Sequence, residues 1–88
     1  MSLIKEVEIY LNKVLEELDY ECECNLMKSQ VPSLGQFQIN VAMGLAKKHH
    51  KNPREIADTI VSKLDDRFTN VNIAGPGFIN VSFTDEYS

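Results

Sequence analysis

The chain has little of what membrane-embedded and disulfide-stabilised proteins require. Its 88 residues hold no apolar run near the about 20 residues that cross a bilayer. The first residues, Met1 to Glu6, lack the basic region and the apolar stretch of a secretion signal. The only two cysteines, Cys22 and Cys24, lie two residues apart on a predicted strand, without the geometry that a disulfide needs. We therefore expect a cytoplasmic protein with reduced thiols and no contact with membranes.

Positive charge is also scarce. Nine Lys and Arg residues stand against 13 Asp and Glu residues, a net charge of −4. Because counterion release requires a strongly positive surface, this balance excludes a general, salt-driven binder of nucleic acids and predicts no DNA partner. Only the middle third of the chain is positive, with a short cluster at Lys47, Lys48, Lys51 and Arg54. The cluster has two interpretations, a solvated helix end that the helix dipole favours and a contact with phosphates.

Side chains suited to catalysis or metal binding are few. The two histidines, His49 and His50, are adjacent, which on a helix separates their rings by about 100°. Together with Cys22 and Cys24 they match no standard zinc spacing. The Gly75–Gly77 segment lacks the strand-to-helix context and the lysine of a phosphate-binding loop. We therefore predict no catalytic residue, metal or cofactor in these 88 residues.

The hydrophobic pattern predicts one α+β domain over residues 1–88, with a small, mostly antiparallel sheet covered by three helices. Apolar residues at three- and four-residue steps predict helices from Ile4 to Leu18, from near Gln36 and from Asn52. Alternation with a period of two predicts a strand from Tyr20 to Met27 and a hairpin from Val71 to Phe83. The expected order is helix, strand, helix, helix, strand, strand.

The predicted hairpin carries the most information about function. Its turn is Gly75-Pro76-Gly77, and its second strand alternates Ile79, Val81 and Phe83 with polar or aromatic neighbours. If the aliphatic set is buried, Phe78 and Asn80 share the opposite face, about 6.6 to 6.8 Å apart. A ring and an amide at this spacing suit an unpaired base, because the ring stacks on it and the amide bonds its edge. In the alternative, helices cover this face too, Phe78 is a core residue and Asn80 bonds the backbone.

Four segments of the chain together resemble the N-terminal domain of arginyl-tRNA synthetase. They match that pattern in order and spacing: L-G-Q-F-Q-I-N at Leu34–Asn40, A-M-G-L-A-K-K at Ala42–Lys48, N-P-R-E-I-A at Asn52–Ala57, and A-G-P-G-F-I-N at Ala74–Asn80. The family usually has aspartate where this chain has Gln36.

The resemblance implies an N-terminal module of a larger synthetase that docks on the outer corner of tRNA and contacts an unpaired base of the D-loop. The tRNA-binding residues would be Phe78 and Asn80, with backbone from Gly75, Pro76 and Gly77 close by and phosphate contacts from Lys47, Lys48 and Lys51. The expected partners are tRNA and the remainder of the synthetase chain.

The same resemblance implies that the parent enzyme is an ATP-dependent arginine–tRNA ligase, with ATP and Mg²⁺ bound outside this domain. Neither ATP-binding signature of that synthetase class, the His-Ile-Gly-His type or the Lys-Met-Ser-Lys-Ser type, occurs in the 88 residues. The alternative function is a structural or protein-interaction domain that uses the same sheet face as an interface.

Overall fold

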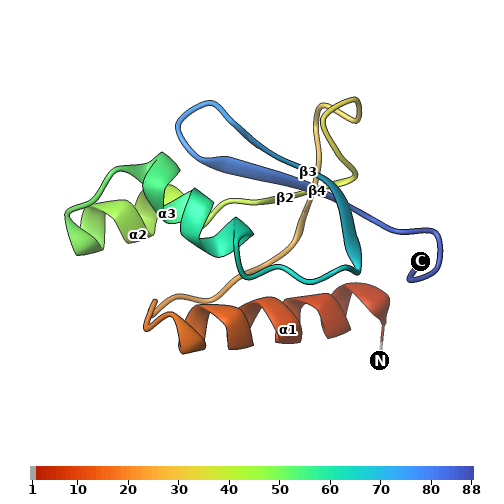
Figure 1. Ribbon diagram of the computed structural model, residues 1–88, viewed down its shortest axis with the longest axis horizontal. Coiled ribbons are helices and arrows are strands. Elements are labelled where there is room, and N and C mark those ends of the chain that lie inside the picture. Colours follow the sequence, from red (N-terminus) through yellow and green to blue (C-terminus); the bar gives the residue numbers. More distant parts are fainter. Residues whose placement is uncertain (1) are drawn as a thin grey trace.

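The computed structural model describes residues 2–88, which form three helices and one four-stranded sheet (Figure 1). The elements are α1 (Leu3–Glu17), β1 (Met27–Lys28), β2 (Phe37–Ile39), α2 (Ala42–His49), α3 (Pro53–Val61), β3 (Phe68–Ala74) and β4 (Phe78–Phe83). The strands lie in the order β1-β2-β4-β3, and every neighbouring pair is antiparallel. The predicted α+β class is confirmed. None of the helices in residues 2–88 is long and apolar enough to cross a membrane.

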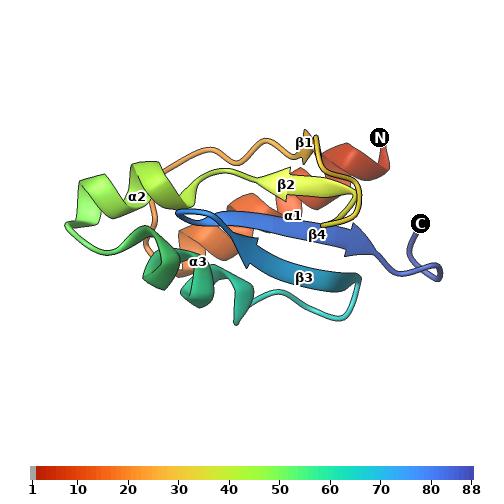
Figure 2. The ribbon, with the colours of Figure 1, turned by 90° about the horizontal axis from the view of Figure 1, so that it is seen from above.

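Helix α1 covers one face of the sheet, which we call the inner face (Figures 1 and 2). The helix begins where the Ser2 hydroxyl accepts a hydrogen bond from the Lys5 backbone N–H at 3.1 Å. Its buried side chains pack with those of the strands in a single core that includes Val7, Leu11, Leu15, Ile39, Ile79 and Val81. The opposite face, here called the outer face, has no helix over it in either view.

The segment predicted as a strand from Tyr20 to Met27 pairs with another strand only from Met27 onward. Before that point its backbone bonds side chains of α1. The Cys24 N–H donates to Asn12 Oδ1 at 2.8 Å, and the Leu26 N–H donates to Glu8 Oε2 at 2.8 Å. These acceptors lie four residues apart, on one side of the helix, and take the place of the backbone of a partner strand. The strand prediction is therefore wrong for residues 20–26.

The second helix begins at Ala42, and the residues before it form the strand β2. Phe37 pairs with Val81, and Ile39 pairs with Ile79. The Phe37 ring stacks on the Phe83 ring, with 5.1 Å between the ring centroids. The prediction of a helix from near Gln36 is therefore wrong for residues 36–41. Pairing with β4 outweighs the local helical pattern because it buries apolar side chains on the inner face.

The turn of the β3–β4 hairpin is held against the first turns of α2 and α3. At Gly77, where φ is 139°, a Cβ atom would lie 3.2 Å from Pro53 and 3.3 Å from Ala42, so only glycine fits. The Arg54 guanidinium donates to the Gly75 carbonyl at 2.6 Å. These contacts fix the turn, and with it the start of β4 at Phe78.

Candidate functional site

Three amide side chains lie next to one another across the outer face. They belong to Gln38 on β2, Asn80 on β4 and Asn72 on β3, which are direct cross-strand partners. Gln38 Nε2 donates to Asn80 Oδ1 at 3.1 Å, and Asn80 Nδ2 donates to Asn72 Oδ1 at 3.1 Å. Asn72 Nδ2 then donates to the backbone carbonyl of Leu34 at 2.6 Å. We call this series of hydrogen bonds the amide chain.

The hairpin register places Asn72 in the amide chain. The pairing of β3 with β4 is irregular between Thr69 and Asn72, where Asn70 has a positive φ of 51°. Beyond this bulge the pairing is regular, so Asn72 faces Asn80 and Ala74 faces Phe78. Because a slip of one residue would send the Asn72 side chain to the inner face, the bulge and the turn together build the outer face.

Part of the outer face is covered by the loop between β1 and β2, and Gly35 of this loop lies directly against β4. A Cβ atom at Gly35 would lie 3.0 Å from the backbone N and O of Val81 and 3.3 Å from Asn80 Cβ. Under this loop Asn80 is 0% exposed. The side chain lies on the outer face, as the alternation predicts, but the expectation that it faces solvent is wrong, and its cover is a loop and not the helices of the alternative.

Beside the amide chain the outer face forms an open hollow of about 460 Å³, which we call the outer-face hollow. Its lining comes from β1, β2, the loop between them and both ends of the hairpin turn: Met27, Lys28, Gln30, Val31, Leu34, Gln38, Asn40, Ala74 and Phe78. Phe78 is half-buried, and Met27, Val31 and Leu34 are 51%, 49% and 37% exposed. The lining holds one cation, Lys28, and no carboxylate. Such a surface suits a planar, uncharged group.

The turn residues predicted for the site lie beside Phe78. Gly75 and Pro76 are exposed, and a Cβ atom at Gly75 would lie 3.4 Å from the Phe78 ring. Gly77 is buried against Pro53 and serves the fold. The structure therefore brings two of the three turn residues to the surface next to the outer-face hollow.

The three predicted lysines lie elsewhere. Lys47, Lys48 and Lys51 are exposed at the C-terminal end of α2, beyond the end of the sheet (Figure 2). None of them lines the outer-face hollow. Lys48 Nζ forms an ion pair with the Glu21 carboxylate at 3.4 Å and donates to the Glu21 carbonyl at 3.1 Å. The structure thus separates the lysines from Phe78.

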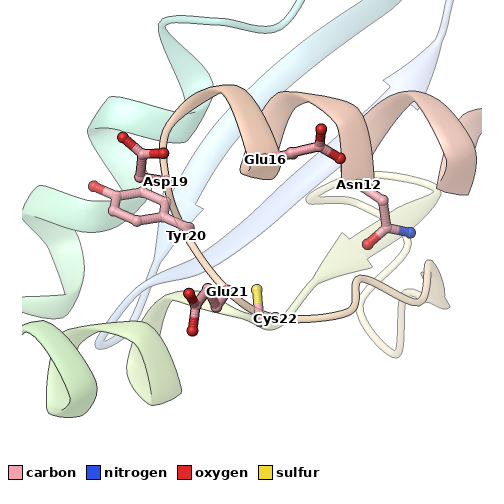
Figure 3. Close-up of a pocket in the computed structure, with 6 residues that line it drawn as sticks. All are labelled: Asn12, Glu16, Asp19, Tyr20, Glu21 and Cys22. Carbon is pink, nitrogen blue, oxygen red and sulfur yellow. The ribbon is translucent and has the colours of Figure 1, made fainter.

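A second hollow, of about 430 Å³, lies where α1 ends and the chain turns back (Figure 3). Its lining is Asn12, Glu16, Asp19, Tyr20, Glu21 and Cys22, and we call it the acidic hollow. Three carboxylates make it unfavourable for a phosphate-bearing ligand. Within residues 2–88, no group of three or more His, Cys, Asp and Glu side chains is placed to hold a metal ion.

The surroundings of both cysteine thiols disfavour the thiolate and raise the thiol pKa. Burial raises the pKa of the Cys24 thiol to about 12. Burial also raises the pKa of the Cys22 thiol, against a smaller opposing effect from the charge of Lys48. Because the thiolate is the nucleophile in cysteine chemistry, neither residue has the shift that an activated cysteine shows.

Four residues of this site, Gln38, Asn72, Lys28 and Gly35, are not predicted as such from the sequence. Gln38 was placed at the start of a helix, where amides often cap or are simply exposed. The available signal was the alternation of Phe37, Gln38 and Ile39, which is only three residues long. Gly35 lies in the loop between β1 and β2, and its role is a close approach to β4.

Comparison with known proteins identifies the family. The sequence matches the family described as the arginyl tRNA synthetase N terminal domain over residues 1–83. An arginine–tRNA ligase of Pseudoalteromonas translucida is 48% identical over 62 residues, which are 68% of this chain and 11% of the relative. One from Staphylococcus epidermidis is 40% identical over 90 residues, covering 98% of this chain and 16% of the relative. The chain therefore spans less than a fifth of these relatives' length.

Solved structures show the same fold. The arginyl-tRNA synthetase of Plasmodium falciparum matches with a TM-score of 0.84 at 18% identity, over 97% of this chain and 16% of that chain. The enzyme of Thermus thermophilus matches with a TM-score of 0.79 at 18% identity, over 97% of this chain and 14% of that chain. With the family match over residues 1–83, the chain belongs to the arginyl-tRNA synthetase N-terminal domain family.

Proposed function

We propose that the outer face of the sheet binds an unpaired base of the D-loop, at the outer corner of tRNA, as the N-terminal module of an arginine–tRNA ligase. The whole enzyme would attach arginine to tRNA in the cytoplasm, using ATP and Mg²⁺ bound by the rest of the synthetase chain. Residues 1–88 would supply tRNA recognition and no active site. The observation that carries this proposal is the half-buried Phe78 ring in an open hollow that is lined mainly by apolar and amide side chains and has no carboxylate.

Phe78 supplies most of the binding free energy in this proposal. Stacking of one base on an aromatic ring contributes about 1 to 3 kcal/mol. The Gly75 and Pro76 backbone, exposed beside the ring, lets the sugar and phosphate of the bound nucleotide approach closely. Lys28 lines the same hollow and would supply a cation for a phosphate. Asn80 contributes from beneath, because it holds the Gln38 amide in place.

The lysines at the end of α2 have a secondary role in this proposal. Lys47 and Lys51 are exposed and would meet phosphates of other nucleotides, farther along the tRNA. Lys48 shares its charge with Glu21, so we expect less from it. Because the net charge is −4, these contacts would be local and their number small.

The test is equilibrium binding of an arginine tRNA transcript to the 88-residue chain at two salt concentrations. Phe78→Ala should weaken binding about fivefold to 150-fold, the equivalent of one lost stack. Ile9→Ala is the matched control, because Ile9 is an exposed apolar residue, 51% accessible, on α1. Thermal unfolding of each variant separates lost binding from lost folding.

The rival function is a protein-interaction domain that uses the same face. The exposed apolar side chains of Met27, Val31 and Leu34 favour it. Under this rival, tRNA binding would be absent or unaffected by salt, and Phe78→Ala would leave it unchanged. Binding that weakens with salt and depends on Phe78 contradicts the rival.

A further inference from the structure

We infer that the side-chain oxygen of Gln38 accepts a hydrogen bond from an N–H on the edge of the bound base, so that binding in the outer-face hollow depends on that N–H. The inference rests on the proposed function of this face. Gln38 lines the hollow, whereas its neighbour Asn80 is 0% exposed and offers no surface to a ligand. The amide that bonds the base edge is therefore Gln38 on β2, whereas the sequence suggested Asn80 on the neighbouring strand β4.

The orientation of the Gln38 amide follows from the other end of the amide chain. The Leu34 carbonyl can only accept, so the nitrogen of Asn72 must face it and the oxygen of Asn72 must face Asn80. By the same reasoning the nitrogen of Asn80 faces Asn72, and the oxygen of Asn80 faces the nitrogen of Gln38. One backbone carbonyl thus sets the direction of three side chains.

The oxygen of Gln38 is the acceptor left for a ligand. One N–H of its nitrogen bonds Asn80 Oδ1 at 3.1 Å, and no donor within residues 2–88 bonds its oxygen. A flip of the Gln38 amide would set two oxygens against each other at Asn80, which leaves two acceptors unpaired. The hollow therefore presents an acceptor in a fixed position, with the second N–H of the same amide as a donor beside it.

The strand register brings this acceptor within reach of a base stacked on Phe78. Gln38 lies directly opposite Asn80, and Phe78 precedes Asn80 by two residues, so Gln38 and Phe78 are diagonal neighbours on one face. Diagonal neighbours on paired strands are about 7 to 8 Å apart, which long side chains span. A base lying on the ring has its edge toward β2.

A fixed acceptor selects a base edge that carries an N–H. Uridine offers N3–H, and N3-methyluridine has the same ring without that donor. The hollow should therefore distinguish these two nucleotides, and the distinction should depend on Gln38. A single hydrogen bond of this kind corresponds to roughly three- to tenfold in affinity.

The experiment measures tRNA binding to the 88-residue chain by fluorescence anisotropy. An abasic scan of the unpaired D-loop nucleotides first locates the bound position, which then carries uridine or N3-methyluridine. We expect the unaltered chain to prefer uridine by roughly three- to tenfold. Gln38→Met, which keeps the length of the side chain and removes the acceptor, should bind both tRNAs equally.

Lys13→Met is the control, because Lys13 is exposed on α1, which covers the inner face, and does not line the hollow. It should keep the preference for uridine. Equal binding of both tRNAs by the unaltered chain overturns the inference, even if Gln38→Met does not fold. A preference that persists in folded Gln38→Met also overturns it.

The Phe78→Ala variant distinguishes a failure of the inference about Gln38 from a failure of the proposed function. If Phe78→Ala weakens tRNA binding while the methyl group has no effect, the inference about Gln38 fails and the proposed function stands. If neither Phe78→Ala nor the abasic scan changes the affinity, the proposed function fails and the inference fails with it.

Discussion

The two faces of β4 are chemically opposite at the centre of the strand, where both are buried. Ile79 and Val81 on the inner face and Asn80 on the outer face are each 0% exposed. The first two contact the apolar side chains of α1, α3 and the other strands in the core, while Asn80 forms hydrogen bonds with two other amides. Burial alone therefore does not distinguish a position in the apolar core from a position in the amide chain. The chemistry of the partners does.

The difference also shows where the fold tolerates change. Apolar side chains on the outer face would bury as much surface as the amides do. Stability alone therefore does not require hydrogen-bonded amides there. The hydrogen bonds of the amide chain have one fixed order of donors and acceptors between Leu34 and Gln38. This order depends on the close approach of Gly35 and on the β3 bulge. The inner face stabilises the domain, and the outer face orients polar groups.

Ile79→Ala is the substitution expected to have the largest effect. Removing a fully buried isoleucine leaves a cavity between the sheet and α1 and should cost about 2 to 5 kcal/mol of the free energy of unfolding. For a domain of this size, each kcal/mol lowers Tm by about 4 to 8 °C. Chemical denaturation measures the loss. Binding of tRNA per folded molecule should stay unchanged, and a specific loss of affinity would contradict the division between the faces.

Asn80→Ala should be less destabilising than Ile79→Ala but should affect both properties. It leaves the Gln38 nitrogen and the Asn72 oxygen without partners, at a cost of about 1 to 3 kcal/mol in the free energy of unfolding. It also frees the Gln38 amide to turn, so the preference for uridine over N3-methyluridine should fall. Denaturation and anisotropy on the same sample measure the two effects.

Asn25→Ala is the matched control for Asn80→Ala, since Asn25 is exposed and belongs to the segment before β1. It should change the free energy of unfolding by no more than about 0.5 kcal/mol. A loss of stability in Asn80→Ala with the base preference intact would make Asn80 a purely structural residue.

Much of this architecture follows from the sequence because the hairpin fixes its own register. With a three-residue turn at Gly75–Gly77, counting outward pairs Ala74 with Phe78 and Asn72 with Asn80, as the structure has them. The alternation of apolar residues then identifies Ile79 and Val81 as buried. Local pattern and tertiary packing agree here, so the predicted burial of Ile79 and Val81 is confirmed, whereas the first strand begins at Phe68 and not at Val71.

The amide chain could not be predicted because its determinants are distant in sequence. Asn80 bonds Gln38 across 42 residues, and Asn72 bonds the Leu34 carbonyl across 38. The three residues of β2 are too short a segment to show alternation against the helical pattern that follows them. Likewise, the contact of Gly35 with Val81 depends on the fold of a loop, which periodicity does not describe.

The acidic hollow provides the smallest expected effect and tests whether the outer-face hollow is the tRNA site. Its volume of about 430 Å³ is close to the about 460 Å³ of the outer-face hollow, but its lining includes Glu16, Asp19 and Glu21. Neutralising two of them, with Glu16→Gln and Asp19→Asn together, should raise tRNA affinity by less than about threefold at physiological salt, because screening limits exposed charges to about 8 Å. Asparagine also tolerates the positive φ of 59° at position 19, so the fold should be kept. A rise of tenfold or more would place the end of α1 in the tRNA interface. Both hollows would then belong to the surface that contacts tRNA, and they would differ only in charge.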